Sequence, residues 1–179
     1  AISFIRALIE IMKKIPNVKI FVLNLLDDFP EIDDVKIYNS NFKAISLALY
    51  NNINKKKSND PNAEKIIFFI NDYVKIQNHL NKLKAEDASV ITIDDLINLS
   101  IGTTNFKFIL VNDSSLSSID NKNWSDYYDS GNAIVLGMDS DELSIVESTG
   151  SYDGTKITKD TAILIRDYKR CFVKFVRYK

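Results

Sequence analysis

The chain has 179 residues, of which 45% are hydrophobic and 26% are charged, and its formal net charge at pH 7 is -1. This composition is typical of a globular protein that is long enough to bury a sizeable core, and the near-zero charge gives no reason to expect nucleic acid or an anionic membrane as a partner. The single cysteine, Cys171, cannot form an internal disulfide, and no apolar stretch approaches the ~20 residues of a membrane span, so we expect no direct membrane insertion.

Short apolar runs alternate along the chain with segments whose apolar residues recur at helical spacing. In chain order, we expect a helix over residues 3–15, a strand over 19–26, a marginal strand over 35–38, a helix over 41–53, a strand over 65–72, a helix over 74–84, a helix from 92 to about 102, a strand over 106–111, a short strand over 133–136, a helix or helical turn over 141–149, and a hairpin of strands over 162–165 and 171–176.

This order of elements predicts the fold class. Strands that alternate with helices and end in a hairpin indicate a three-layer α/β sandwich, with a mostly parallel sheet and a C-terminal antiparallel hairpin at its edge. We find no internal repeat or linker, and therefore predict a single domain over residues 1–179. The sequence starts inside an expected helix and without a methionine, which indicates a fragment of a larger multidomain chain.

The most informative stretch is the expected strand over 65–72, whose apolar run ends on Asn71 and Asp72. Ligands of α/β folds bind at the carboxyl ends of the central strands. Four or five apolar residues followed by two acids form the Walker B pattern, in which the first acid serves Mg²⁺ and the second polarises water. Here the first acid is an amide. The pattern therefore indicates either a vestigial nucleotide site or an ordinary strand end that hydrogen-bonds the next turn.

The order of elements resembles the RecA-like ATPase domains of the FtsK/SpoIIIE group, and most closely the C-terminal domain of the EssC family of type VII secretion ATPases. The segments that carry this resemblance are residues 3–9 (the helix behind the phosphate loop), 18–28, 41–55, 66–72 (the Walker B strand), 106–112 (the sensor strand, ending at Asn112), 131–137 with 139–145, and 162–177 (the closing hairpin). The resemblance implies a RecA-like sandwich, with ATP and Mg²⁺ as cofactors of the active members.

Departures from this family pattern lie at both sites that would hold the magnesium ion. If Ser3 stands just after the phosphate loop, Ala1 and Ile2 occupy the places of its lysine and its serine or threonine, and neither side chain can bind phosphate or metal. Asn71 replaces the magnesium-side acid, and Asp72 stands where the family has its catalytic carboxylate. We therefore expect no catalytic residue, metal or cofactor. The vestigial nucleotide site would comprise Ala1, Ile2, Ser3, Asn71, Asp72 and Asn112.

The expected function is a degenerate ATPase domain that serves a type VII secretion motor as a structural, regulatory or substrate-recognition module. The resemblance implies a cytoplasmic domain of a chain anchored at the cell membrane, with other ATPase domains of the same chain and small helical secreted proteins as partners. We expect the partner surface to include Tyr73, Trp124, Tyr127 and Tyr128. Two alternatives stay open: an active ATPase whose phosphate loop lies upstream or is completed in trans, and an unrelated α/β binding module.

Overall fold

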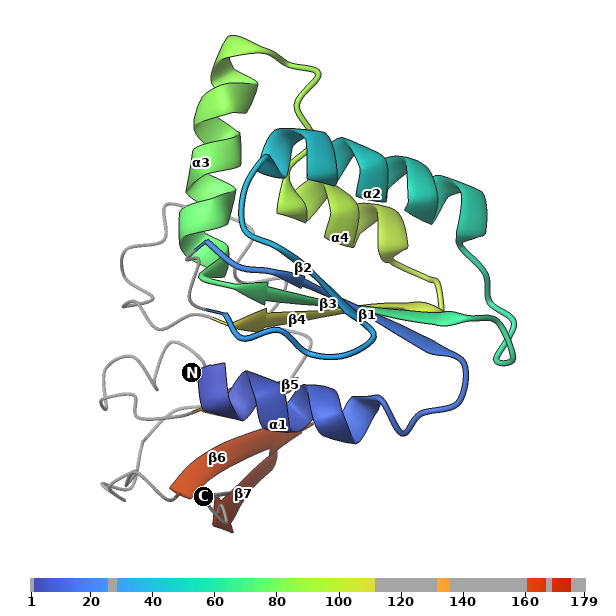
Figure 1. The fold of residues 1–179 in the computed structure, drawn as a ribbon, viewed down its shortest axis with the longest axis vertical. Coiled ribbons are helices and arrows are strands. Elements are labelled where there is room, and N and C mark those ends of the chain that lie inside the picture. Colours follow the sequence, from blue (N-terminus) through green and yellow to red (C-terminus); the bar gives the residue numbers. More distant parts are fainter. Residues whose placement is uncertain (1, 26–28, 112–131, 136–160, 167–168, 175–179) are drawn as a thin grey trace. The chain divides into compact units, whose positions relative to one another are not determined.

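The computed structural model of the protein describes residues 2–25, 29–111, 132–135, 161–166 and 169–174 (Figure 1). The chain divides into two compact units, Ala1–Ser114 and Ser115–Lys179. Each unit is described by itself, and the expectation of one domain over the whole chain stays a prediction.

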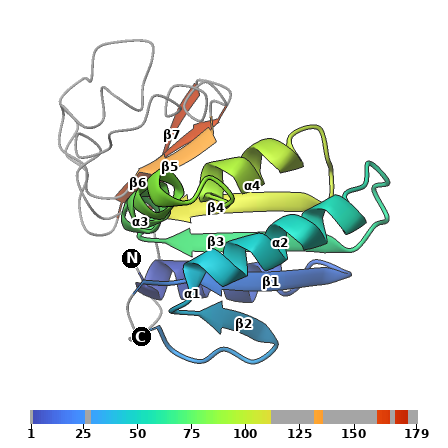
Figure 2. The same ribbon diagram turned by 90° about the horizontal axis from the view of Figure 1, so that it is seen from above.

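The first unit is built on a parallel sheet of four strands in the order β2-β1-β3-β4. Figure 1 shows α2, α3 and α4 on one face of this sheet and α1 on the other, and Figure 2 gives the same arrangement from above. The elements are α1 (Ile2–Met12), β1 (Val18–Leu23), β2 (Val35–Tyr38), α2 (Phe42–Lys56), β3 (Lys65–Asn71), α3 (Tyr73–Glu86), α4 (Ile93–Ser100) and β4 (Phe106–Val111). The predicted three-layer α/β sandwich with a parallel sheet is confirmed for this unit.

The central strand is β3, which pairs with β1 on one side and with β4 on the other. Every residue of β3 after Lys65 is buried, as the unbroken apolar run predicts for a strand that helices cover on both faces. Leu23 pairs with Ile70, and Asn71 pairs with Val111, so the carboxyl ends of the three strands lie along one edge of the sheet.

Alternate residues of the strands form the two layers of the core. One face carries Ile20, Val22, Ile67 and Phe69, which form a cluster with Ile5 and Ile9 of α1. The opposite face carries a row of rings: Phe68 lies 5.3 Å from Phe21 and 5.0 Å from Phe108, and Tyr38 stacks on Phe21 at 6.5 Å between ring centroids. The row therefore links all four strands beneath the helices.

Helix α4 begins with a capping box. The Thr92 side chain accepts a hydrogen bond from the Asp95 backbone N–H, and the Asp95 side chain accepts one from the Thr92 backbone N–H. This reciprocal capping box satisfies two backbone donors that the first turn of a helix leaves without partners. Thr92 is thus the N-cap of α4.

Strand β1 is shorter than expected, since it ends at Leu23 rather than near residue 26. Asn24 continues the pairing only through its backbone N–H, which donates to the Tyr38 carbonyl at 2.8 Å, while its side chain turns into the protein. Helix α2 is longer than expected and reaches Lys56, because the Lys57 N–H still donates to the Ile53 carbonyl.

The second unit contains an antiparallel sheet of three strands in the order β5-β6-β7: β5 (Asn132–Val135), β6 (Thr161–Arg166) and β7 (Lys169–Lys174). The predicted hairpin is confirmed as β6 and β7. Strand β6 of the hairpin also pairs with β5, from Asn132↔Arg166 to Val135↔Ile163, so the three strands form one antiparallel sheet. The helix expected over 141–149 lies outside the described residues. Among the helices that the structure does describe, none has the length and apolar character for a membrane span.

Candidate functional site

The candidate site lies at the carboxyl end of β3, where the strand passes directly into α3. Asn71 is the last residue of the strand and Tyr73 is the first of the helix. The single residue between them, Asp72, has the left-handed backbone conformation (φ 54°, ψ 41°). Aspartate and asparagine tolerate this region better than most residues, so Asp72 allows a junction without a loop. The backbone thereby fixes two consecutive polar side chains at the end of the central strand.

The Asn71 side chain is occupied by a partner from the neighbouring strand. Its Nδ2 donates to Oδ1 of Asn24, which follows β1, at 2.6 Å. Both side chains are buried, with Asn24 fully inaccessible and Asn71 6% exposed. A hydrogen bond between two neutral amides in such a place is strong, and a lost partner would leave a buried polar group unsatisfied. At this position, where the sequence predicts a vestigial magnesium-side residue, the side chain is a neutral amide held by a buried hydrogen bond.

The Asp72 carboxylate lies beside a cation of the protein itself. Its side chain is only 4% exposed, and Nζ of Lys75 lies 3.3 Å from its Oδ1. Lys75 belongs to the first turn of α3 and is half exposed. The pair brings a buried negative charge and a partly solvated positive charge together at the candidate site.

These donors do not fit a magnesium ion. Mg²⁺ requires oxygen ligands in near-ideal octahedral geometry, and carboxylates supply most of the protein's share. Here one oxygen of Asp72 faces an ammonium group, and Asn71 contributes no charge and is bonded to Asn24. Within the described ranges, no group of three or more His, Cys, Asp or Glu side chains is arranged to hold a metal ion.

Tyr73 lies in the core and not on a surface. It is 1% exposed, and its hydroxyl donates to Oδ1 of Asp94 at 2.6 Å. A docked partner would not reach this ring, so the expected role of Tyr73 in a partner surface does not agree with its position. The physical reason is that α4 packs over the start of α3, a tertiary contact that local sequence does not reveal.

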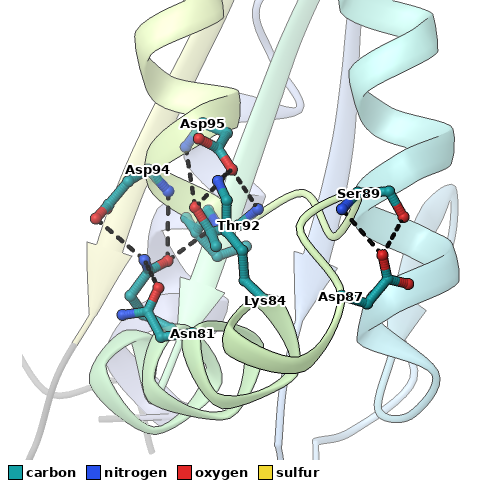
Figure 3. Close-up of polar contacts among 9 residues, drawn as sticks. Asn81, Lys84, Asp87, Ser89, Thr92, Asp94 and Asp95 are labelled. Atoms are coloured by element: carbon teal, nitrogen blue, oxygen red, sulfur yellow. Dashed lines mark hydrogen bonds and ion pairs between the residues drawn. The ribbon is translucent and has the colours of Figure 1, made fainter.

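The starts of α3 and α4 are joined by a buried polar network (Figure 3). Gln77 donates through Nε2 to Asp94 at 3.0 Å, and its Oε1 accepts from the backbone N–H groups of Ile93 and Asp94 at 3.0 and 3.3 Å. Gln77 thus hydrogen-bonds both the backbone at the α4 N-terminus and the buried Asp94 carboxylate. The network fixes α4 against the helix that begins at the candidate site.

The neighbouring Asp95 combines the capping box with an ion pair. Lys84 Nζ lies 2.6 Å from its Oδ2. Burial by itself raises the pKa of Asp95, but hydrogen bonds from Lys84 and Thr92 outweigh it and hold the pKa below the ordinary value. These charges stabilise the helix start and are not available for a ligand without a cost to the cap.

The structure brings together only part of the predicted vestigial site. Asn71 and Asp72 are adjacent at the strand end, as expected. Ile2 begins α1 and packs against the apolar cluster on that helix's side of the sheet, and Ser3 follows it in the same helix. The remaining predicted residues lie outside the described part of the chain: Ala1, Asn112, Trp124, Tyr127 and Tyr128.

Two residues of the site were not among those predicted, Asn24 and Lys75. A polar residue at the end of an apolar run was the available signal for Asn24, but its partner lies on another strand. Lys75 stands three residues after Asp72, a spacing that places two side chains together at a helix start.

No protein family model matches this chain, and no curated protein matches it by sequence. Among solved structures, the chain is similar to one described as "The cytoplasmic domain of EssC", with a TM-score of 0.46 and 12% sequence identity. The match covers 87% of this chain and 33% of that one, so the chain spans about one third of the length of the protein that it matches.

Proposed function

We propose that this chain is a degenerate RecA-like domain that neither hydrolyses ATP nor requires Mg²⁺, and that serves a type VII secretion motor as a structural, regulatory or substrate-recognition module. The observation that supports it is the buried pair of Asn71 and Asn24 at the carboxyl end of the central strand. Asn71 is a neutral amide held by Asn24, so it supplies none of the negative charge with which a carboxylate attracts a hard cation.

The assignment to secretion rests on the sequence resemblance to the EssC family. On that basis the domain faces the cytoplasm within a membrane-anchored parent chain, and its partners are the other ATPase domains of that chain and small helical secreted proteins. Trp124, Tyr127 and Tyr128 remain the proposed contact residues. Aromatic side chains with a polar tip are enriched at such surfaces.

The first test is Mg-ATP binding, measured by thermal unfolding with and without millimolar Mg-ATP. A ligand that binds only the folded state at a hundred times its dissociation constant adds about 2.7 kcal/mol. In a domain of this size that corresponds to a rise of several degrees in Tm. We expect no rise. An increase in Tm that EDTA abolishes would instead support the alternative of an active ATPase completed upstream or in trans.

The second test separates a secretion module from an unrelated α/β binding module. We expect the C-terminal tail of a helical secreted substrate to bind with a Kd on the order of micromolar, about -8 kcal/mol. The Tyr127→Ala, Tyr128→Ala double variant should bind more weakly. Equal affinity for both proteins would move the contact elsewhere, and no binding by the wild type would argue against the recognition role.

A further inference from the structure

We infer that Lys75 is the built-in cation of the candidate site: its ammonium group, instead of a divalent metal ion, balances the buried carboxylate of Asp72, and so excludes Mg²⁺. The inference rests on the proposed function, because it explains how the carboxylate after β3 can stay buried in a domain that holds no magnesium ion. The direct observation is the 3.3 Å distance from Lys75 Nζ to Asp72 Oδ1, with the Asp72 side chain 4% exposed.

A carboxylate with so little exposure needs compensation. Transfer of an ionised group away from water is costly unless a counter-charge or hydrogen bonds accompany it. Lys75 provides the positive charge at ion-pair distance and keeps its own head half in water, so only one of the two groups bears most of the desolvation.

The position of Lys75 in its helix supports this role. Asp72 is the N-cap of α3, so Lys75 is the third residue of the helix, and the first turn contains no acidic residue. A cation in the first turn is opposed by the helix dipole, and glutamate or glutamine is the favoured residue at this point of a capping box. A lysine there is unfavourable for the helix alone, but it is explained by the buried carboxylate at the cap.

A divalent ion would have to displace this ammonium group. It would meet one carboxylate, a neighbouring neutral amide and a resident positive charge, and like charges repel strongly where water is scarce. Two features therefore oppose a metal ion: Asn71 lacks the charge of a ligand carboxylate, and the Lys75 ammonium group lies against one oxygen of the Asp72 carboxylate. Restoring only the missing ligand charge, by Asn71→Asp, should therefore leave the site without metal.

The experiment measures Mn²⁺ binding to the whole 179-residue chain by water-proton relaxation, since Mn²⁺ accepts the same oxygen ligands as Mg²⁺. The proteins are the wild type, Asn71→Asp, Lys75→Gln and the Asn71→Asp, Lys75→Gln double variant. We expect the double variant to bind Mn²⁺ at least about tenfold more tightly than Asn71→Asp alone, a difference of about 1.4 kcal/mol.

The matched control combines Asn71→Asp with Lys43→Gln. Lys43→Gln likewise removes the positive charge of an aspartate's ion-pair partner, but the aspartate in question, Asp87, is exposed on the surface. The control should bind Mn²⁺ no better than Asn71→Asp alone. The inference is overturned if the control gains as much as the double variant, if Asn71→Asp alone binds as tightly, or if the folded double variant binds no Mn²⁺.

Should the double variant not fold, thermal unfolding of the single change decides the question. Lys75→Gln should lower Tm in the wild-type background and change it little in the Asp72→Asn background, where no charge needs balance. An equal decrease in both backgrounds overturns the inference. Failure of the proposed function looks different, because it would show as Mg-ATP binding by the wild type itself.

Discussion

The pair of Asn24 and Asn71 can be broken from either side, and the two changes should not be additive. Asn24→Ala leaves the Asn71 amide without its acceptor at a place where Asn71 is 6% exposed. An unsatisfied buried donor costs about 1–3 kcal/mol. Asn71→Ala removes the hydrogen bond that Asn71 donates to the buried Asn24 oxygen, and should cost a similar amount. The double variant removes both partners, and should therefore be more stable than the sum of the single changes by about 1–2 kcal/mol.

The assay is urea unfolding of the three variants and the wild type, with the slope of free energy against urea checked for constancy. Asn98→Ala on the exposed side of α4 is a matched control that should cost less than about 0.5 kcal/mol. Single changes that sum to the double change within about 0.5 kcal/mol would show that the 2.6 Å contact carries no coupling, and would refute the reasoning.

Two further predictions concern stability. Ser46 on α2 has a buried hydroxyl for which the described residues supply no hydrogen-bond partner, so Ser46→Ala should leave the free energy of unfolding unchanged or raise it by up to about 1 kcal/mol. Ser100→Ala loses a 2.7 Å hydrogen bond to the Ile97 carbonyl and should instead lower the free energy of unfolding, measured by the same urea unfolding. Folding lowers the pKa of Asp95, so its ionised carboxylate stabilises the protein above the pKa of the unfolded chain. This stabilisation is lost as the pH falls through the pKa of the folded protein. Below about pH 4 the free energy of unfolding of Lys84→Met should therefore fall less steeply than that of the wild type. Identical pH profiles for the two proteins would contradict this assignment.

The sequence was most informative where a local pattern determines a local structure. An unbroken apolar run predicted β3, and the polar residues from Thr92 predicted the start of α4, because a buried strand and a helix start each depend on a few consecutive residues. The same holds for β6 and β7, whose short apolar runs flank a polar connection in the sequence. These elements need no knowledge of distant residues.

The rest depended on partners far away in the chain. Asn24 belongs to the site only because β1 lies beside β3, and Tyr73 is buried only because Asp94 and α4 cover it. In the sequence, Asn24 and Tyr73 are simply a polar and an aromatic residue near a strand end. Their neighbours along the chain would be the same whether the side chain faces solvent or the core. The pairing of the hairpin with β5 likewise joins distant parts of the chain, and periodicity does not encode it.

The row of rings across the parallel sheet has a consequence for how the first unit acquires its structure. Phe21, Phe68 and Phe108 come from three widely separated parts of the chain, and no hairpin brings any two of them together early. Proteins dominated by such distant contacts fold slowly, because the chain entropy of closing long loops is lost before the contacts form. During synthesis, the ring of Phe68 would remain uncovered on one side until residue 108 has left the ribosome. In that interval the apolar edge of β3 is open to any neighbouring strand, so the nascent chain is most prone to aggregate shortly before β4 is complete.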